Sequence, residues 1–201
     1  WIDSDKRFDV INPYTREIVD TVPVVSPVLL EKALQQSHKY HCDLTGVERA
    51  SILSGAAATL ETERDTIARL ITSESGLCIK HTLYEIDRAI NCLQFSVLQA
   101  EKIDDIDVTA DFISSPNTLD PRLAVITEPW DLAVGITPFN HPLNLVVHKV
   151  APAIAAGTPI VVKPSEKTPL TALKLGQILI ENGLPANMVN IVTGVPSKVI
   201  V

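Results

Sequence analysis

The alternation of strand-like and helix-like segments over residues 132–193 restricts the possible folds of this chain more than any other feature. Three apolar segments of strand length lie at 132–137, 159–163 and 188–193. Two segments with helical periodicity separate them, at 142–156 and from Thr168 to Asn182, and each is followed by a glycine. Short links between such segments predict parallel strands joined by right-handed helical crossovers. The pattern therefore predicts an α/β fold, one half of a doubly wound, Rossmann-like sheet.

The first 101 residues have a different pattern, which predicts a small hairpin followed by helices. Residues 9–24 alternate apolar and polar side chains around an Asn12-Pro13 turn. Ser26 before Pro27 and the Thr45-x-x-Glu48 capping box are signals of helix starts, and Gly76 is a helix stop. We expect helices at 27–41, 45–60, 62–74 and 80–101. Residues 107–129 contain two extended segments that leave this helical layer.

The charge and the cysteines exclude several kinds of protein. A net charge of −7 without a basic patch argues against nucleic acid and anionic membranes as partners. Three cysteines without CxxC spacing indicate reduced thiols and a cytoplasmic location. We find no membrane span or signal peptide, and we expect no metal site because His38, His41 and Cys42 lack a fourth ligand. The non-Met start and apolar end indicate a piece of a longer protein.

The turn after the first predicted strand carries Pro138, Phe139, Asn140 and His141 and contains no glycine, unlike a phosphate-binding loop. Asn140 stands where the N-cap of the next helix belongs, and the residues alone favour that role. The alternative is that a rigid turn points the Asn140 amide into a cleft. There it would donate to an oxygen that gains negative charge during a reaction.

The turn after the second predicted strand contains Lys163 and Glu166. In dinucleotide-binding folds an acidic residue after this strand accepts hydrogen bonds from the adenosine ribose. The alternative is a solvated loop before a helix that Thr168 caps. Elsewhere, the spacing of Arg88 and Glu85 favours an ion pair on a helix surface, and the valines around His148 favour a packed histidine.

Several segments resemble the aldehyde dehydrogenase superfamily. These are residues 128–172, which include GITPFNHPLN and VVKPSEKTP, the GLPANMVNIVTG segment at 183–194, and NPYTREIVDTVP at 12–23. The resemblance covers essentially all 201 residues. It implies that 1–106 and 130–201 form part of an NAD(P)-binding domain and that the catalytic domain is absent. It also implies that 107–129 is part of a β-arm through which subunits pair into homodimers or homotetramers.

The resemblance also implies roles for individual residues. Asn140 would donate to the oxyanion of a thiohemiacetal. The remaining implied roles concern the cofactor: Ile136, Thr137, Pro138 and Phe139 would line its channel, Lys163, Ser165 and Glu166 would hold its adenosine ribose, and Gly194 would lie against its adenosine end. A carboxylate at Glu166 favours NAD because it repels a 2′-phosphate, and the neighbouring Lys163 is also compatible with NADP.

The implied reaction is the oxidation of an aldehyde to a carboxylic acid. In the family a cysteine thiolate attacks the aldehyde, hydride passes to nicotinamide, and a glutamate-activated water hydrolyses the thioester. Family members are more than twice as long, and their nucleophile and general base would lie beyond residue 201. We therefore assign neither role to Cys42, Cys78 or Cys92, and we expect this piece to be inactive alone. The alternative is a stand-alone, non-catalytic nucleotide-binding or assembly module.

The matched segments depart from the family pattern at Asp131, Thr158, Pro159 and His141. At His141 an aromatic residue is commoner, and FNHPLN resembles the branch that oxidises phosphonoacetaldehyde. That resemblance implies that His141 and Arg88 hold the phosphonate of a small anionic aldehyde, since a dianion suits an arginine fork and an imidazole donor. The lactaldehyde and succinate-semialdehyde branches are alternatives, as is a histidine that only opens a helix.

Overall fold

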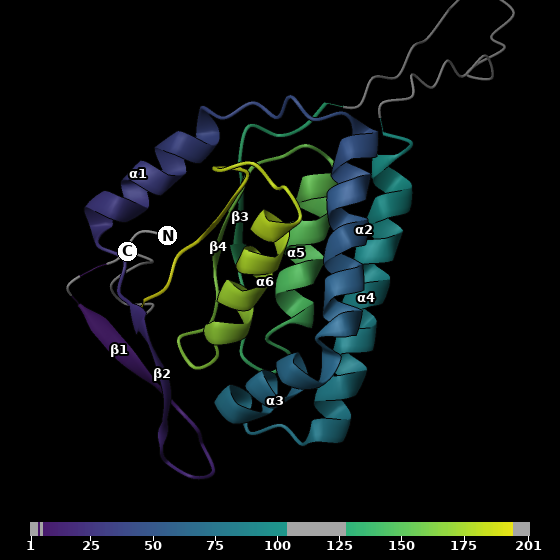
Figure 1. The fold of residues 1–201 in the computed structure, drawn as a ribbon. Coiled ribbons are helices and arrows are strands. Elements are labelled where there is room, and N and C mark those ends of the chain that lie inside the picture. The colour runs from purple at the N-terminus through teal and green to yellow at the C-terminus, as the bar shows by residue number, and fades with distance from the viewer. Residues whose placement is uncertain (1–3, 5, 104–127, 195–201) are drawn as a thin grey trace, which may run out of the picture.

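The helices of this protein pack in a layer against a small parallel sheet, and a separate hairpin lies beside the sheet (Figure 1). The computed structural model describes residue 4 and residues 6–103 and 128–194. The elements are β1 (Arg7–Ile11), β2 (Ile18–Pro23), α1 (Pro27–His38), α2 (Gly46–Thr62), α3 (Arg64–Ser75), α4 (Ile79–Ala100), β3 (Ala133–Ile136), α5 (Asn144–Ala155), β4 (Ile160–Lys163), α6 (Leu170–Glu181) and β5 (Val189–Ile191). The predicted arm at 107–129 lies almost wholly outside the described residues.

The parallel sheet has the strand order β3-β4-β5. Ala133 is opposite Ile160, and Ile160 is opposite Val189 on the other side. All four residues of β4 are buried, as expected for the central strand of a sheet covered on both faces. Helices α5 and α6 are the crossover connections, so the predicted β-α-β-α-β unit is confirmed.

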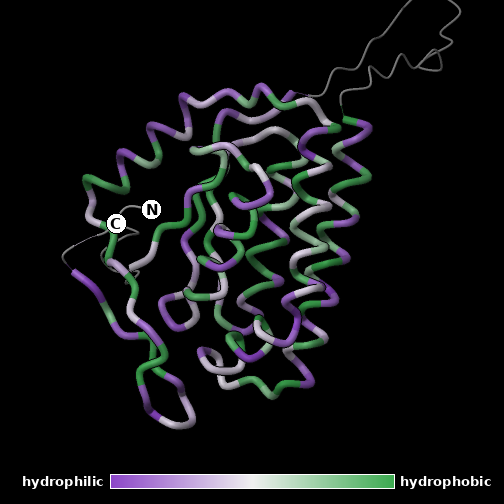
Figure 2. The backbone as a smooth tube through the Cα atoms, in the orientation of Figure 1, coloured by the Kyte–Doolittle hydropathy of each residue, from purple (hydrophilic) through white to green (hydrophobic). Residues whose placement is uncertain are grey.

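Helices α5 and α6 lie between the sheet and the longer helices α2 and α4, whereas α1 contacts β4 and β5 (Figure 1). The largest fully buried side chains, among them Leu53, Leu93, Ile154 and Leu179, belong to one core that joins these layers. Helices α2 and α4, which lie farther from the sheet than α5 and α6, alternate between hydrophobic and hydrophilic residues along their length (Figure 2). This alternation is that of helices with one buried face.

Local signals fix several of these element ends, as the sequence predicts. The Ser26 hydroxyl accepts from Leu29 N at the start of α1, and both hydrogen bonds of the capping box between Thr45 and Glu48 are present at the start of α2. Gly76 ends α3 in the left-handed conformation, with φ 75°, which glycine adopts without strain. The predicted hairpin is also confirmed, because β1 and β2 pair antiparallel.

The side chain of Thr158 accounts for one departure from the family pattern, since its hydroxyl accepts from Trp130 N at 3.0 Å. Pro159 lies just before β4, where its missing N–H costs no ladder hydrogen bond, and its carbonyl accepts from Ala133 N. The prediction for His148 is wrong. This residue is exposed on α5 rather than packed among the neighbouring valines.

No helix in the described ranges, 6–103 and 128–194, is both long and apolar enough to cross a membrane.

Candidate functional site

The turns that follow β3 and β4 meet at one edge of the sheet, where both parallel strands end. Thr137 N donates to Lys163 O at 3.2 Å and so extends the pairing of the two strands by one residue. Farther along, the ammonium of Lys167 lies 4.5 Å from the centre of the Phe139 ring, a cation–π contact. We call this surface, made of residues 136–144 and 163–169, the carboxyl edge. It contains most of the site residues predicted from the sequence.

Asn140 is exposed in the first of these turns and does not cap the following helix. Helix α5 begins at Asn144, its N-cap position is Leu143, and no side chain of its own segment caps it. No hydrogen bond among the described residues uses the Asn140 side chain. The capping interpretation of Asn140 is therefore wrong, and its amide stays available at the carboxyl edge.

A carboxylate from a distant helix caps α5 instead. Glu85 of α4 is 1% exposed, and its Oε1 accepts from the backbone N–H groups of Leu143 and Asn144 at 2.8 and 3.0 Å. This arrangement satisfies two orphan donors and places negative charge at the positive end of a helix. The predicted ion pair between Glu85 and Arg88 is wrong: Glu85 faces α5, Arg88 is exposed one turn farther along α4, and no ion pair joins the two among the described residues.

Helix α6 is capped in the same manner by Glu74 of α3, which is 3% exposed. Its two carboxylate oxygens accept from Leu170 N at 2.8 Å and Thr171 N at 3.0 Å, and the Thr171 hydroxyl donates to the second of them. The alternative in which Thr168 caps this helix is wrong, because Pro169 occupies the N-cap position and the Thr168 side chain has no partner. Burial raises the pKa of Glu74 to about 7, although these hydrogen bonds oppose the shift.

A signal for these distant caps is present in the sequence. Glu85 lies four and eight residues before Ala89 and Leu93, which are both buried, so it belongs to the apolar stripe of its helix. A glutamate on such a stripe must find buried partners, since burying an unpaired charge is costly. Helix ends without a local cap are the natural partners for such a residue.

His141 extends this group of buried polar atoms. Its Nδ1 lies 3.5 Å from Oε2 of Glu85, the carboxylate oxygen that caps nothing, while about a third of the His141 side chain stays exposed. Burial raises the pKa of Glu85, and the N–H donors of Asn144 and Leu143 and the nearby His141 act against this rise. Glu85 therefore contacts both the first turn of α5 and the predicted substrate residue.

Unpartnered polar atoms gather at the carboxyl edge. Within 6–103 and 128–194, the buried side-chain atoms without a hydrogen-bond partner are Glu85 Oε2, Thr137 Oγ1, His141 Nδ1, Asn144 Oδ1 and Nδ2, and Thr168 Oγ1. Every one of them lies on this edge or against it. Buried polar groups are normally satisfied, so this concentration of unpartnered atoms sets the carboxyl edge apart from the rest of the described chain.

At the end of β4 the ammonium of Lys163 is buried, whereas the turn that follows exposes part of the Glu166 carboxylate. Lys163 is 5% exposed, and its Nζ donates to Pro164 O at 3.0 Å and lies 3.6 Å from Glu166 Oε2. Glu166 is about one-third exposed, whereas Ser165 is buried and its hydroxyl accepts from Lys167 N. Gly194 is buried three residues after β5, at the same end of the sheet.

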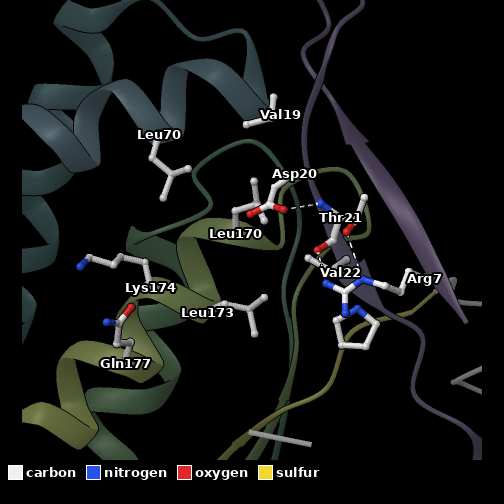
Figure 3. Close-up of a pocket in the computed structure, with 11 residues that line it drawn as sticks. Arg7, Val19, Asp20, Thr21, Val22, Leu70, Leu170, Leu173, Lys174 and Gln177 are labelled. Carbon is white, nitrogen blue, oxygen red and sulfur yellow. Dashed lines mark hydrogen bonds between the residues drawn. The ribbon is translucent and has the colours of Figure 1, made fainter. Parts of the chain in front are cut away.

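A separate cavity of about 350 Å³ lies between β2 and α6 (Figure 3). Its charged groups already have partners: the Arg7 guanidinium donates to the Thr21 hydroxyl and carbonyl, and Lys174 pairs with Glu63 at 2.8 Å. None of the predicted site residues lines this cavity. Nor does the described part of the chain hold a cluster of three His, Cys, Asp or Glu residues that would bind a metal ion.

Parallel strands in this order, with crossover helices and polar turns at their carboxyl ends, define the doubly wound nucleotide-binding class of α/β protein. The sequence model of the Aldehyde dehydrogenase family matches residues 1–200. The chain belongs to this family.

Individual relatives agree with this assignment. The chain is 38% identical to aspartate-semialdehyde dehydrogenase 1 of Pseudomonas canavaninivorans over 94% of its own length and 41% of that protein. It is 32% identical to 3-sulfolactaldehyde dehydrogenase of Priestia aryabhattai, over 96% of this chain and 40% of that one. The betaine aldehyde dehydrogenase of Staphylococcus aureus, solved with NAD+, superposes with a TM-score of 0.87 at 28% identity, covering 99% of this chain and 40% of that one. The chain thus spans about two-fifths of the length of these relatives.

Proposed function

We propose that the full-length protein oxidises an aldehyde to a carboxylic acid with NAD(P) as oxidant, and that this chain supplies the cofactor edge and the oxyanion donor. The observation that carries the proposal is the carboxyl edge itself, where an exposed amide, unpartnered buried polar atoms and a partly exposed carboxylate lie together. Family membership supports the reaction type. Aldehyde-dependent reduction of NAD by the full-length protein, followed by absorbance, tests it.

In this proposal the exposed amide of Asn140 donates to the oxygen that becomes negative when a nucleophile adds to the aldehyde. Such a donor acts best when it is fixed in advance, because no reorganisation is then needed at the moment of reaction. Pro138 and Pro142 stiffen the turn on either side, and the Glu85 hydrogen bonds hold its end. The nucleophile and the general base are not assigned to Cys42, Cys78 or Cys92, none of which lies on the carboxyl edge.

The cofactor, when bound, accepts a hydride from the substrate carbon. Residues of both turns are suited to hold it. In the proposal the backbone of the first turn and the buried Thr137 lie along it, and Ser165 and Glu166 accept from its ribose hydroxyls. The residues assigned to the cofactor are Ile136, Thr137, Pro138, Phe139, Lys163, Ser165, Glu166 and Gly194. The polar atoms that lack partners at this edge fit a polar ligand of this kind.

Replacing Glu166 by Ala is expected to shift the cofactor preference toward NADP. A carboxylate that accepts from the ribose hydroxyls repels a 2′-phosphate, and its loss leaves the buried ammonium of Lys163 to attract one. We expect the ratio of kcat/KM for NADP to that for NAD to rise about tenfold, equivalent to ~1.4 kcal/mol. Steady-state kinetics with both cofactors measure this ratio, and Glu181→Ala, at the far end of α6, is the control. An unchanged ratio would remove Glu166 from the cofactor site.

We also propose that the substrate is a small aldehyde with an anionic group, held by Arg88 and His141. Arg88 is exposed on α4 one turn beyond Glu85, which itself contacts the turn that carries His141. Two relatives are named for aldehydes with an acidic group, aspartate semialdehyde and 3-sulfolactaldehyde. Phosphonoacetaldehyde fits the same requirement, as does succinate semialdehyde, whereas lactaldehyde does not.

Replacing Arg88 by Ala in the full-length protein is expected to raise KM for a phosphonate- or carboxylate-bearing aldehyde at least tenfold. A charge-assisted hydrogen bond contributes about 1.5–3 kcal/mol, and a neutral aldehyde of similar size does not use it. The measurement is therefore the ratio of the two KM values. Arg69→Ala, on the exposed side of α3, serves as the matched control. Equal effects on both aldehydes would contradict an anion-binding role for Arg88.

We propose, finally, that full-length subunits form homodimers or homotetramers through residues 107–129, with 1–106 and 130–201 in the cofactor domain.

A further inference from the structure

We infer that Glu85 is a positioning residue that determines which nitrogen of His141 carries a proton. This inference rests on the proposed function, since it matters for catalysis only if His141 contacts the substrate. It concerns atoms that the proposed reaction does not otherwise use. They are Oε2 of Glu85 and Nδ1 of His141, both buried, 3.5 Å apart and each without a hydrogen-bond partner in the described chain.

The two oxygens of Glu85 have different tasks. Oε1 accepts from Leu143 N and Asn144 N, so the carboxylate is held by two hydrogen bonds and cannot rotate freely. Oε2 then faces His141, which follows Asn140 in the turn before α5. An ionised carboxylate only accepts hydrogen bonds, so the Nδ1 that faces it must carry a hydrogen. The position of the proton on His141 is therefore fixed by a helix cap.

This arrangement has a consequence for the exposed side of the ring. With Nδ1 protonated, the neutral imidazole presents a lone pair at Nε2, whereas the imidazolium presents an N–H donor. An anionic substrate group at Nε2 needs the N–H donor that only the imidazolium form or the other tautomer presents there, and in the imidazolium the Nδ1–H still faces the Glu85 carboxylate.

Replacing Glu85 by Gln separates this role from the capping role. The glutamine carbonyl must take the place of Oε1, because only an oxygen can accept from Leu143 N and Asn144 N. The amide NH₂ is then directed at His141, where it donates to an unprotonated Nδ1. We therefore expect the neutral imidazole of His141 to change from the Nδ1–H to the Nε2–H tautomer in Glu85→Gln.

Nitrogen-15 NMR of histidine-labelled full-length protein, at a pH of about 9 where histidine is neutral, distinguishes the two tautomers. The His141 signals are assigned by their loss in His141→Asn. Glu74→Gln is the matched control, since it makes the same change in the cap of α6, where the carboxylate accepts from Leu170 N and Thr171 N. We expect Nδ1–H in the wild type and in Glu74→Gln, and Nε2–H in Glu85→Gln. The same tautomer in all three proteins would overturn the inference.

Kinetics provide the second measurement. Glu85→Gln replaces a charged donor at the substrate by a neutral one, so we expect the ratio of KM for an anionic aldehyde to KM for a neutral one to rise about five- to tenfold. Glu74→Gln should leave the ratio unchanged. If the tautomer changes but neither Glu85→Gln nor His141→Asn alters the ratio, the positioning role stands and the substrate-binding role of His141 fails. A raised ratio without a change of tautomer would contradict the positioning role.

Discussion

Replacing Asn140 by Ala is expected to lower kcat of the full-length enzyme about 10²- to 10³-fold, the usual cost of losing one oxyanion donor. The amide is proposed to act on negative charge that develops only during the reaction. KM for the aldehyde and for the cofactor should therefore change much less than kcat. Steady-state kinetics with saturating NAD measure both quantities. Single-turnover measurement of the hydride-transfer step shows whether the loss lies in the chemistry.

A loss of kcat in Asn140→Ala can be assigned to the reaction itself, because Asn140 does not cap α5. A slow Asn140→Ala enzyme could not be attributed to a frayed helix, since the two N–H groups at that helix start are bound by Glu85. Asn91→Ala, on the exposed face of α4, is the matched control and should keep the wild-type kcat. A folded Asn140→Ala enzyme with a near-normal kcat would remove the oxyanion role.

Replacing Glu74 by Leu is expected to destabilise the protein by about 3–5 kcal/mol. The substitution leaves the N–H groups of Leu170 and Thr171 and the Thr171 hydroxyl without their acceptor in a buried place. Hydrogen exchange is the direct measurement. The amides of Leu170 and Thr171 should exchange roughly 10²- to 10³-fold faster, because the first turn of α6 opens more easily.

Two other variants separate this effect from a general loss of charge. Glu74→Gln keeps one oxygen acceptor and should lose less than half as much stability. Glu61→Leu removes an exposed carboxylate from α2 and should change the stability by no more than about 0.5 kcal/mol. If Glu74→Leu were as stable as Glu61→Leu, the cap would contribute little to the fold.

The same carboxyl group should make the stability depend on pH. The pKa of Glu74 is about 7 in the folded state, above its ordinary value of 4.5, so the folded protein binds more protons than the unfolded one between these values. Its contribution is full below pH 4.5 and is lost as the pH rises through 7, which amounts to about 3 kcal/mol. Comparing wild type with Glu74→Gln across this range isolates the effect. A constant difference between the two proteins would contradict the raised pKa.

Much of the framework follows from local sequence alone. Ser26, the Thr45 and Glu48 pair, and Gly76 act within four residues of themselves, and the structure confirms all of them. The alternation that predicts three parallel strands also holds, because side-chain periodicity depends only on neighbouring residues. The turns at 136–144 and 163–169 could be placed on one edge from the sequence, since parallel strands end on the same side of a sheet. Their positions follow from topology rather than from side-chain detail.

Apart from His148, which is exposed rather than packed, the errors concern helix ends that are capped by residues far away in the sequence. The residues alone favour Asn140 as the cap of α5 and leave Thr168 as one alternative for the cap of α6, because each stands close to a helix start, where local caps usually lie. The actual caps, Glu85 and Glu74, are separated from the groups they bind by 58 and 96 residues. The predicted ion pair between Arg88 and Glu85 failed for the same reason. Glu85 lies on the same helix as Arg88 but faces α5, where it binds backbone N–H groups.

The sequence by itself thus determined the class of fold, the order of its elements, the family resemblance and the two turns that form the candidate site. Only the tertiary structure decided which side chains at that site lack partners and which form the hydrogen bonds that hold its turns in place. The physical reason is that a buried carboxylate must find its donors wherever packing brings them. That choice depends on how α3 and α4 are rotated against α5 and α6, and no local pattern encodes this rotation.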